Sequence, residues 1–294
     1  MKKILVTAVI TAALCNIQYS IADSHSRHFA PSKVKDNILM LSNKGGNIAI
    51  SKGSDGLLII DNGYSDQSKE LAATLEKIGG ESELQYIINT HWHGDHSGAN
   101  ELLGNIATIV AHDNVRNRLK ASQSIPLFGM ESTPYAKPGL PSLTYPDSIN
   151  IHFNDDTLTL KHYPNGHTDS DTVVFFKQAN VVHMGDHLFY PMFPFIDVGN
   201  QGNAINYAAN VKAVLDQIDD QTIVIPGHGP VTDKAGLTDF LAMLEGTIGE
   251  VKTMKMAGKT LEQSQQAGLS NRWQQWQGGF IKEPAWIKII YTSL

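Results

Sequence analysis

The stretch that decides the fold is NTHWHGDHSG, residues 89–98. It places three of the chain's 12 histidines within six positions, directly after residues 84–90, whose apolar centre predicts a β-strand. Alternate residues of a strand share a face. We therefore expect His91 and His93 to point at one centre while Trp92 points away.

The second half of this stretch predicts a change of direction. Gly94 permits a turn into the start of a helix, where Asp95 and His96 emerge toward a second point. Imidazole and carboxylate groups at this density are typical of a site for zinc or a similar divalent ion.

Three other apolar runs end in the same way, with a metal-binding residue type directly after a glycine. These residues are His167 after Gly166, Asp186 after Gly185, and His228 after Gly227. Glycine lets the backbone turn sharply and approach other groups closely. Sites in α/β folds gather where strands end in loops, so we expect these donors to meet the first stretch.

Hydrophobic patterns along the chain predict a single α/β domain over residues 23–294, with sheets between helices. Strands are expected at 37–41, 47–51, 57–61, 84–90, 108–111, 149–153, 158–162, 172–176, 181–184 and 222–225. Helices are expected from 65, at 97–103, 112–121 and 203–215, and over most of the chain from about 234.

Two segments lack such patterns. Residues 23–36 are polar and are expected to lie outside regular structure. Residues 122–147 contain five prolines together with apolar side chains, which is consistent with a mobile cover over a site or with a packed surface loop. In the same way, the aromatic-rich segment 189–195 could pack in the core or form the wall of a pocket.

The amino terminus predicts an export signal over residues 1–22. Two lysines precede an apolar run from Ile4 to Cys15 that is too short to span a membrane, and cleavage is expected after Ala22. Leu14 stands where a lipid-modified protein has a small residue, so we expect no lipid anchor. The mature chain of 272 residues is therefore expected to act in the periplasm or outside the cell.

The composition restricts the chemistry and the partners. Cys15 is the chain's only cysteine, so the mature protein is expected to use no disulfide and no thiolate. Without the two lysines of the signal, the net charge falls from −6 to −8. Because nucleic-acid binding needs clustered lysine and arginine, we expect no nucleic-acid partner. No segment after the signal is long and apolar enough to span a membrane, so we expect no membrane partner for the mature protein. The expected partner is a small-molecule substrate.

Taken together, the motifs HWHGDH, GHT, GD and PGH, in this order over about residues 37–232, resemble those of the metallo-β-lactamase superfamily. The resemblance implies a four-layer αβ/βα sandwich with a two-metal site at one edge of the sheets. It implies that His91, His93 and His167 hold one zinc ion, that Asp95, His96 and His228 hold the other, and that Asp186 bridges them.

The resemblance further implies a dizinc hydrolase that uses a metal-activated hydroxide on a lactam, lactone, ester or thioester, with Asp95 and Asp186 as catalytic groups. Many lactamases of this superfamily have cysteine or serine where Asp186 stands, so lactonase or thioesterase activity, as in glyoxalase II, is an alternative to β-lactamase activity. A non-catalytic metal-binding or diiron redox module is a third, although diiron relatives usually have a carboxylate at the position of His93.

Other polar residues are expected to support or surround the site. Asp61 matches an aspartate that often supports it, and Thr168 and Asp169 are candidates for the same role. Strand alternation places His183 on the face opposite Asp186, as a core or supporting residue. His187 adjoins Asp186 and is expected to line the site without binding metal.

Overall fold

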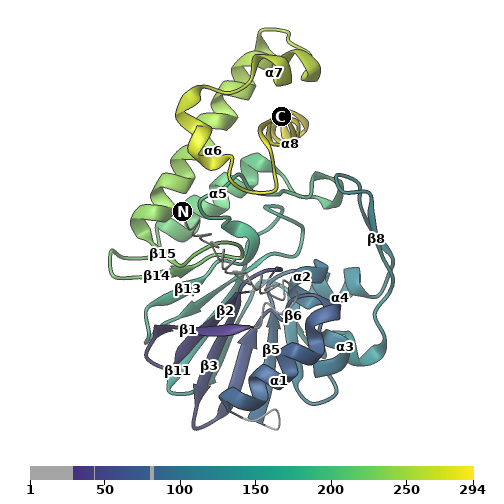
Figure 1. Cartoon of the computed structure of the whole chain (residues 1–294), viewed down its shortest axis with the longest axis vertical. Helices are drawn as coiled ribbons and strands as arrows, with labels where there is room; N and C mark the ends of the chain where they lie inside the picture. The colour runs from purple at the N-terminus through teal and green to yellow at the C-terminus, as the bar shows by residue number, and fades with distance from the viewer. Residues whose placement is uncertain (1–28, 43, 80–82) are drawn as a thin grey trace, which may run out of the picture.

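The computed structural model describes residues 29–42, 44–79 and 83–294, in which two β-sheets lie face to face (Figure 1). The first has the order β1-β2-β3-β4-β5-β6-β9, with β1 Ala30–Lys35, β2 Ile38–Ser42, β3 Ile48–Gly53, β4 Gly56–Ile60, β5 Leu84–Asn89, β6 Thr108–His112 and β9 Leu143–Tyr145. The second has the order β10-β11-β12-β13-β14-β15, with β10 Ser148–Phe153, β11 Asp156–His162, β12 Thr172–Phe176, β13 Val181–His183, β14 Ile223–Ile225 and β15 Thr232–Asp233.

Strand β4 shows why apolar residues run through the sheets without interruption. Leu58 and Ile60 pack between the two sheets, whereas Leu57 and Ile59 pack on the outer face of the first sheet, against helices. Side chains alternate along a strand, so a sheet covered on both faces requires apolar residues at every position.

Helices cover the two outer faces. The first sheet is covered by η1 Ser65–Gln67, α1 Ser68–Ile78, α2 Gly94–Ser97, α3 Asn100–Leu103 and α4 Asp113–Leu119. The second is covered by α5 Ala204–Leu215, α6 Lys234–Met256 and α8 Glu283–Ser293, with α7 Leu261–Ala267 beside α8 (Figure 1). The predicted four-layer αβ/βα sandwich is confirmed. No helix within the described ranges is both long and apolar enough to cross a bilayer.

Two segments are more regular than expected. Residues 30–35 form the edge strand β1, which pairs antiparallel with β2, so the prediction of no regular structure over residues 23–36 is wrong for this part. Within residues 122–147, β7 Gln123–Ile125 and β8 Met130–Ser132 form a hairpin, and β9 extends the first sheet alongside β6. The predicted signal peptide lies outside the described residues, and the extent of the single domain stays a prediction.

The strand directions bring the motifs together. Strands β4, β5 and β6 are parallel to one another, as are β13 and β14 in the other sheet. The loops that follow β4, β5, β13 and β14 carry Asp61, the HWHGDH motif, Asp186 and His228. The site therefore forms where the carboxyl ends of these strands meet, at one edge of the sandwich.

Candidate metal centre

The HWHGDH motif has the geometry expected from its sequence. After β5 ends at Asn89, Nε2 of His91 and Nδ1 of His93 come within 3.1 Å of each other. Trp92 points away and packs, 2% exposed, against Val115 and Leu119 of α4. Period-two alternation thus continues for a few residues beyond the strand and directs both imidazoles at one point.

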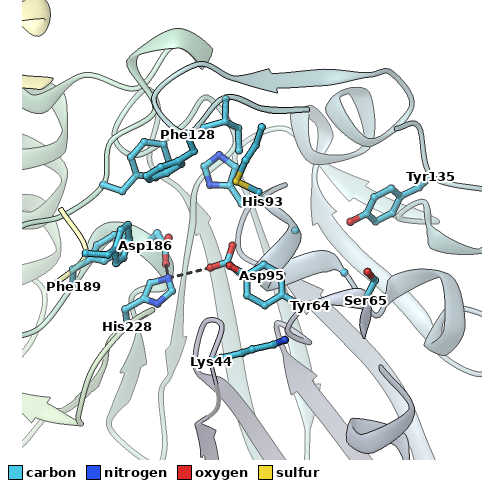
Figure 2. Close-up of a pocket in the computed structure, with 16 residues that line it drawn as sticks. Lys44, Tyr64, Ser65, His93, Asp95, Phe128, Tyr135, Asp186, Phe189 and His228 are labelled. Carbon is cyan, nitrogen blue, oxygen red and sulfur yellow. Dashed lines mark ion pairs between the residues drawn. The ribbon is translucent and has the colours of Figure 1, made fainter. Parts of the chain in front are cut away.

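The structure brings all seven predicted metal-binding residues into two adjacent groups. The first contains His91, His93, His167 and Asp186, and the second contains Asp95, His96 and His228, with the donor atoms of each group within 4.8 Å of one another. The first group is buried, whereas Asp95 and His228 of the second are partly exposed to a cavity (Figure 2).

Asp186 stands between the two groups and turns one carboxylate oxygen toward each. Its Oδ2 lies 3.3 Å from Nε2 of His167 and 3.7 Å from Nε2 of His91. Its Oδ1 lies 3.1 Å from Nε2 of His96 and 3.4 Å from Nε2 of His228. A carboxylate in this position can bind two cations at once.

The chemistry of these residues fits divalent metal ions. Five imidazole nitrogens and two carboxylates converge in a largely buried space, and neutral imidazole and carboxylate are the ligands that zinc prefers among residues without sulfur. Oδ1 of Asp186 is buried and has no well-aligned hydrogen bond within the described residues, although Nε2 of His96 lies 3.1 Å away and buried polar atoms are normally satisfied. A cation would satisfy it. The metal-binding role of each of the seven residues stays a prediction.

Glycines that precede the donors have the predicted close contacts. A Cβ on Gly227 would lie 2.1 Å from Oδ1 of Asp186, and a Cβ on Gly185, whose φ is +50°, would lie 2.8 Å from Cβ of Thr90. At Gly94, in contrast, an added Cβ would meet no atom within 4 Å, so the turn there does not require glycine. Gly185 and Gly227 are therefore required because neighbouring groups lie too close for a Cβ, whereas the turn at Gly94 would tolerate one.

Groups outside the two clusters fix the orientation of the imidazoles. Asp61, fully buried at the end of β4, accepts hydrogen bonds from Nδ1 of His96 at 2.7 Å and from the backbone N–H and hydroxyl of Thr90, both at 2.8 Å. Thr90 in turn lies 3.0 Å from Nδ1 of His91. The position of Asp61 agrees with its predicted supporting role, because hydrogen bonds of this kind orient metal-binding histidines.

Thr168 and Asp169 do not contact the two groups directly. Thr168 donates its hydroxyl to Asp171 and thereby shapes the loop that carries His167, whereas Asp169 forms a salt bridge of 2.9 Å with Arg118. His183 is buried and accepts a hydrogen bond from the backbone N–H of Gly185, in agreement with its predicted supporting position.

Asp197 is a supporting residue that no sequence motif indicates. Its Oδ2 lies 3.1 Å from Nε2 of His93, and it is 2% exposed. Asn200 donates a second hydrogen bond to the same oxygen at 2.8 Å. With Nε2 held in this way, His93 turns Nδ1 toward the first group.

Replacing Asp197 with alanine is expected to lower zinc affinity at the first group by roughly 10- to 100-fold, because His93 loses the acceptor that orients it. Competition with a chromophoric chelator measures this without relying on turnover. Asp197→Asn keeps an acceptor oxygen and should restore part of the affinity. An affinity for zinc that is unchanged in Asp197→Ala would remove the residue from this role.

The two groups differ in their protonation. Burial disfavours a charge on His228, but the carboxylates of Asp186 and Asp95 outweigh it and raise the pKa of His228 to about 9. In the first group, burial dominates and lowers the pKa of His167 to about 4, despite the opposing effect of Asp186. Near neutral pH, the metal-free protein therefore carries a proton on His228 and none on His167.

This difference predicts a pH dependence of metal binding. An imidazole must be neutral to bind metal, so zinc affinity at the second group should rise at least about tenfold per pH unit up to about pH 9. At the first group, His167 should cause no such change above about pH 5. Calorimetric titration of the metal-free protein in buffers of different ionisation enthalpy counts the protons released in each step. Equal proton release in both binding steps at pH 7 would contradict the assignment.

A cavity of about 510 Å³ opens onto the two groups (Figure 2). Asp95, Asp186, His93 and His228 lie along it together with apolar and polar side chains from other segments. The β7–β8 hairpin region contributes several of these: Ile125, Phe128, Met130 and Tyr135. The part of segment 122–147 from Ile125 to Tyr135 thus lies beside the site, as a cover would, and its movement stays a prediction.

The aromatic segment 189–195 both lines the cavity and packs in the core, which are the two possibilities that its sequence left open. Phe189 and Phe195 line the cavity while being 0% and 4% exposed. Phe193 is buried in the core instead, where its ring stacks on that of Trp286. The two possibilities therefore divide between neighbouring residues of one segment.

Comparisons with known proteins agree with this geometry. A family model described as "Metallo-beta-lactamase superfamily" matches residues 44–228. The chain is 23% identical over 184 residues to the "Beta-lactamase-like protein 2 homolog" of Caenorhabditis elegans, which covers 60% of this chain and 53% of that protein. It is also 26% identical over 197 residues to the "Metallo-beta-lactamase type 2" of Bacillus cereus. This alignment covers 65% of this chain and 70% of that protein.

Among solved structures, DIM-1 metallo-beta-lactamase superposes with a TM-score of 0.59 at 20% identity, which covers 74% of this chain and 96% of that one. This likeness concerns the fold. The alignment with the nematode relative spans about half of that protein's length.

Proposed function

The chain belongs to the metallo-β-lactamase superfamily, and from this we propose that it is a dizinc metallo-hydrolase that cleaves a carbonyl compound. One observation carries the proposal: the two oxygens of Asp186 face two separate groups of histidines, at distances of 3.1 to 3.7 Å. A site that binds a single structural metal ion needs one closed set of four ligands and no such shared carboxylate.

The residues of the chain divide the work as follows. His91, His93 and His167 would hold one ion, Asp95, His96 and His228 would hold the other, and Asp186 would join them. Two zinc ions at these positions would lower the pKa of a water toward neutrality and polarise the substrate carbonyl.

Asp95 is placed to act on the attacking water as well. Nearby His96 and His228 outweigh the effect of burial and lower the pKa of the Asp95 carboxyl to about 2. It is therefore ionised and can accept a hydrogen bond from a water in the cavity, which it lines. This would orient the water toward the substrate.

The substrate candidates are lactams, lactones, esters and thioesters. The name of the Bacillus cereus relative favours β-lactams. Asp186, in a position where many lactamases of the superfamily have cysteine or serine, favours a lactonase or thioesterase.

A substrate panel combined with metal analysis tests the proposal. The zinc-loaded protein should contain two ions per chain and hydrolyse at least one of nitrocefin, an acyl-homoserine lactone, a p-nitrophenyl ester and an acyl thioester. Removal of zinc by a chelator should abolish this turnover, and added zinc should restore it. Protein with two bound ions that cleaves none of the four classes would refute the proposal.

We also propose that residues 1–22 direct export and that residues 23–294 act as one domain in the periplasm or outside the cell. Amino-terminal sequencing of the protein recovered from a bacterial periplasm should begin at Asp23. A mature protein that begins at Met1 would overturn the export proposal.

A further inference from the structure

Four phenylalanine rings form a continuous apolar wall on one side of the cavity. Phe128 in the β7–β8 turn lies 4.7 Å from Phe195 and 6.1 Å from Phe280, ring centre to ring centre. Phe280, in turn, lies 6.1 Å from Phe189. We call these four rings the phenylalanine wall. They come from three segments far apart in the sequence, and all four line the same cavity.

The inner end of the phenylalanine wall touches both groups of candidate metal ligands. The ring of Phe189 stacks on His228 of the second group at 4.7 Å and 13°. The ring of Phe195 stacks on His93 of the first group at 5.7 Å and 28°. An apolar chain attached to a carbonyl held between the two groups would therefore reach the wall at once.

The outer end of the wall is exposed to solvent. Phe128 is 42% exposed, Phe280 is 53% exposed, and Met130 beside them on the hairpin is 51% exposed. Large apolar side chains grouped around one cavity at such exposure typically mark a ligand-binding surface. An apolar ligand that covers these three side chains would bury their exposed apolar surface. A polar substrate would gain no binding energy from covering it.

Hydrogen bonds hold the hairpin in place beside the site. The side chain of Asn200 donates to the backbone carbonyl of Ser124 in β7 and to Oδ2 of Asp197, at 2.8 Å each. Because Asp197 also contacts His93, the strand that leads to Phe128 is tied to the first group of ligands. The base of the hairpin that carries Phe128 is therefore held beside the site.

The opposite side of the cavity is polar but offers little for a carboxylate. Figure 2 shows Lys44, Tyr64, Ser65 and Tyr135 there, across from Phe128 and Phe189. Of the described residues that line the cavity, Lys44 is the only lysine or arginine, and it forms an ion pair of 2.6 Å with Asp66. A substrate carboxylate would therefore have to compete with Asp66 for this lysine.

We propose that the substrate is a neutral ester or lactone with an apolar acyl chain, which lies along the phenylalanine wall while its carbonyl reaches the metal centre. This inference rests on the proposed function and narrows its substrate class. It favours a neutral lactone or ester over a carboxylate-bearing β-lactam. The phenyl rings would stabilise an apolar chain of the substrate by burying it, but they offer no favourable interaction to a carboxylate.

A series of p-nitrophenyl esters from acetate to octanoate, given to the zinc-loaded protein, tests the inference. We expect kcat/KM to rise about fourfold for each methylene that the wall covers, because burying one methylene contributes about 0.8 kcal/mol. Phe128→Ala should lower the ratio of octanoate to acetate kcat/KM at least about tenfold, and Met130→Ala should lower it about threefold.

A methionine outside the cavity provides the matched control. Met256 lies at the end of α6, is 79% exposed and does not line the cavity, so Met256→Ala should leave the ratio unchanged. Binding of the neutral dye Nile red gives a readout apart from turnover: Phe128→Ala and Met130→Ala should weaken it, whereas Met256→Ala should not.

The outcomes separate this inference from the function on which it rests. Two results would contradict the binding of an acyl chain by the phenylalanine wall: equal kcat/KM for esters of every chain length, or a dye affinity that Phe128→Ala does not change. Neither result would contradict the proposal that the protein is a hydrolase. A higher kcat/KM for nitrocefin than for a decanoyl lactone would contradict the role of the wall too. Absence of any hydrolysis by the dizinc protein would refute the hydrolase itself.

Discussion

Replacing Asp186 with alanine is expected to reduce the zinc content from two ions per chain to one or fewer and to lower kcat/KM by on the order of 10³ or more. The carboxylate faces four histidines, two from each group, at 3.1 to 3.7 Å. Without its negative charge, two cations about 3.5–4 Å apart would repel each other with nothing between them. Metal analysis by mass spectrometry and steady-state kinetics on the same samples measure both effects.

We expect the loss of zinc and of turnover to follow from the loss of the charge of Asp186 and not from the loss of its volume. Asp186→Asn keeps the shape but cannot supply two anionic oxygens, so it should lose zinc almost as completely as Asp186→Ala. Asp239→Ala, on the exposed face of α6, is the matched control and should change neither zinc content nor kcat/KM. Circular dichroism should show the same secondary structure in all variants. Two zinc ions and unchanged turnover in Asp186→Ala would exclude the shared carboxylate.

The parts of the site that the sequence predicts depend on local geometry. His91 and His93 point at one centre because strand alternation extends past β5, and that rule acts over a few residues. The donors that follow Gly185 and Gly227 could be found because each lies just after a strand whose carboxyl end must reach the edge of the sheet. The family resemblance added which of these donors belong together.

The parts that escaped prediction depend on contacts between distant segments. Asp197 lies 104 positions from His93, and no spacing rule connects them. Four of the six residues of strand β1 are exposed and half are polar, so its pairing with β2 produces no apolar alternation that a sequence could reveal. The phenylalanine wall is likewise invisible in sequence, because Phe128 and Phe280 meet only after both segments fold against the same edge.

Asp61 should make the second large contribution, this time to stability. It is fully buried, and three donors converge on its carboxylate: Nδ1 of His96 and both the N–H and the hydroxyl of Thr90. Burial alone would lower the pKa of His96, but Asp186, Asp95 and Asp61 outweigh it and raise that pKa well above its ordinary value. In the metal-free protein, His96 is therefore a buried cation that faces Asp186 and Asp95 at Nε2 and Asp61 at Nδ1.

Replacing Asp61 with alanine in the metal-free protein is expected to lower the free energy of unfolding by about 3–5 kcal/mol, because three buried donors, one of them on a charged imidazole, lose their acceptor. For a chain of this size, that corresponds to a fall in Tm on the order of 10 °C. Asp61 also has a φ of +63°, which alanine adopts less readily than aspartate or asparagine. Asp61→Asn, which keeps an acceptor and tolerates this φ, should lose less.

An exposed ion pair supplies the comparison that isolates burial as the cause. Asp216 pairs with Lys212 on α5 at 2.8 Å, but both side chains are more than half exposed. Asp216→Ala should therefore leave the free energy of unfolding almost unchanged. If urea denaturation of the metal-free protein gave Asp61→Ala and Asp216→Ala the same small loss, the carboxylate of Asp61 would not be what holds His96. In that case its support of the metal centre would have to act on Thr90 alone.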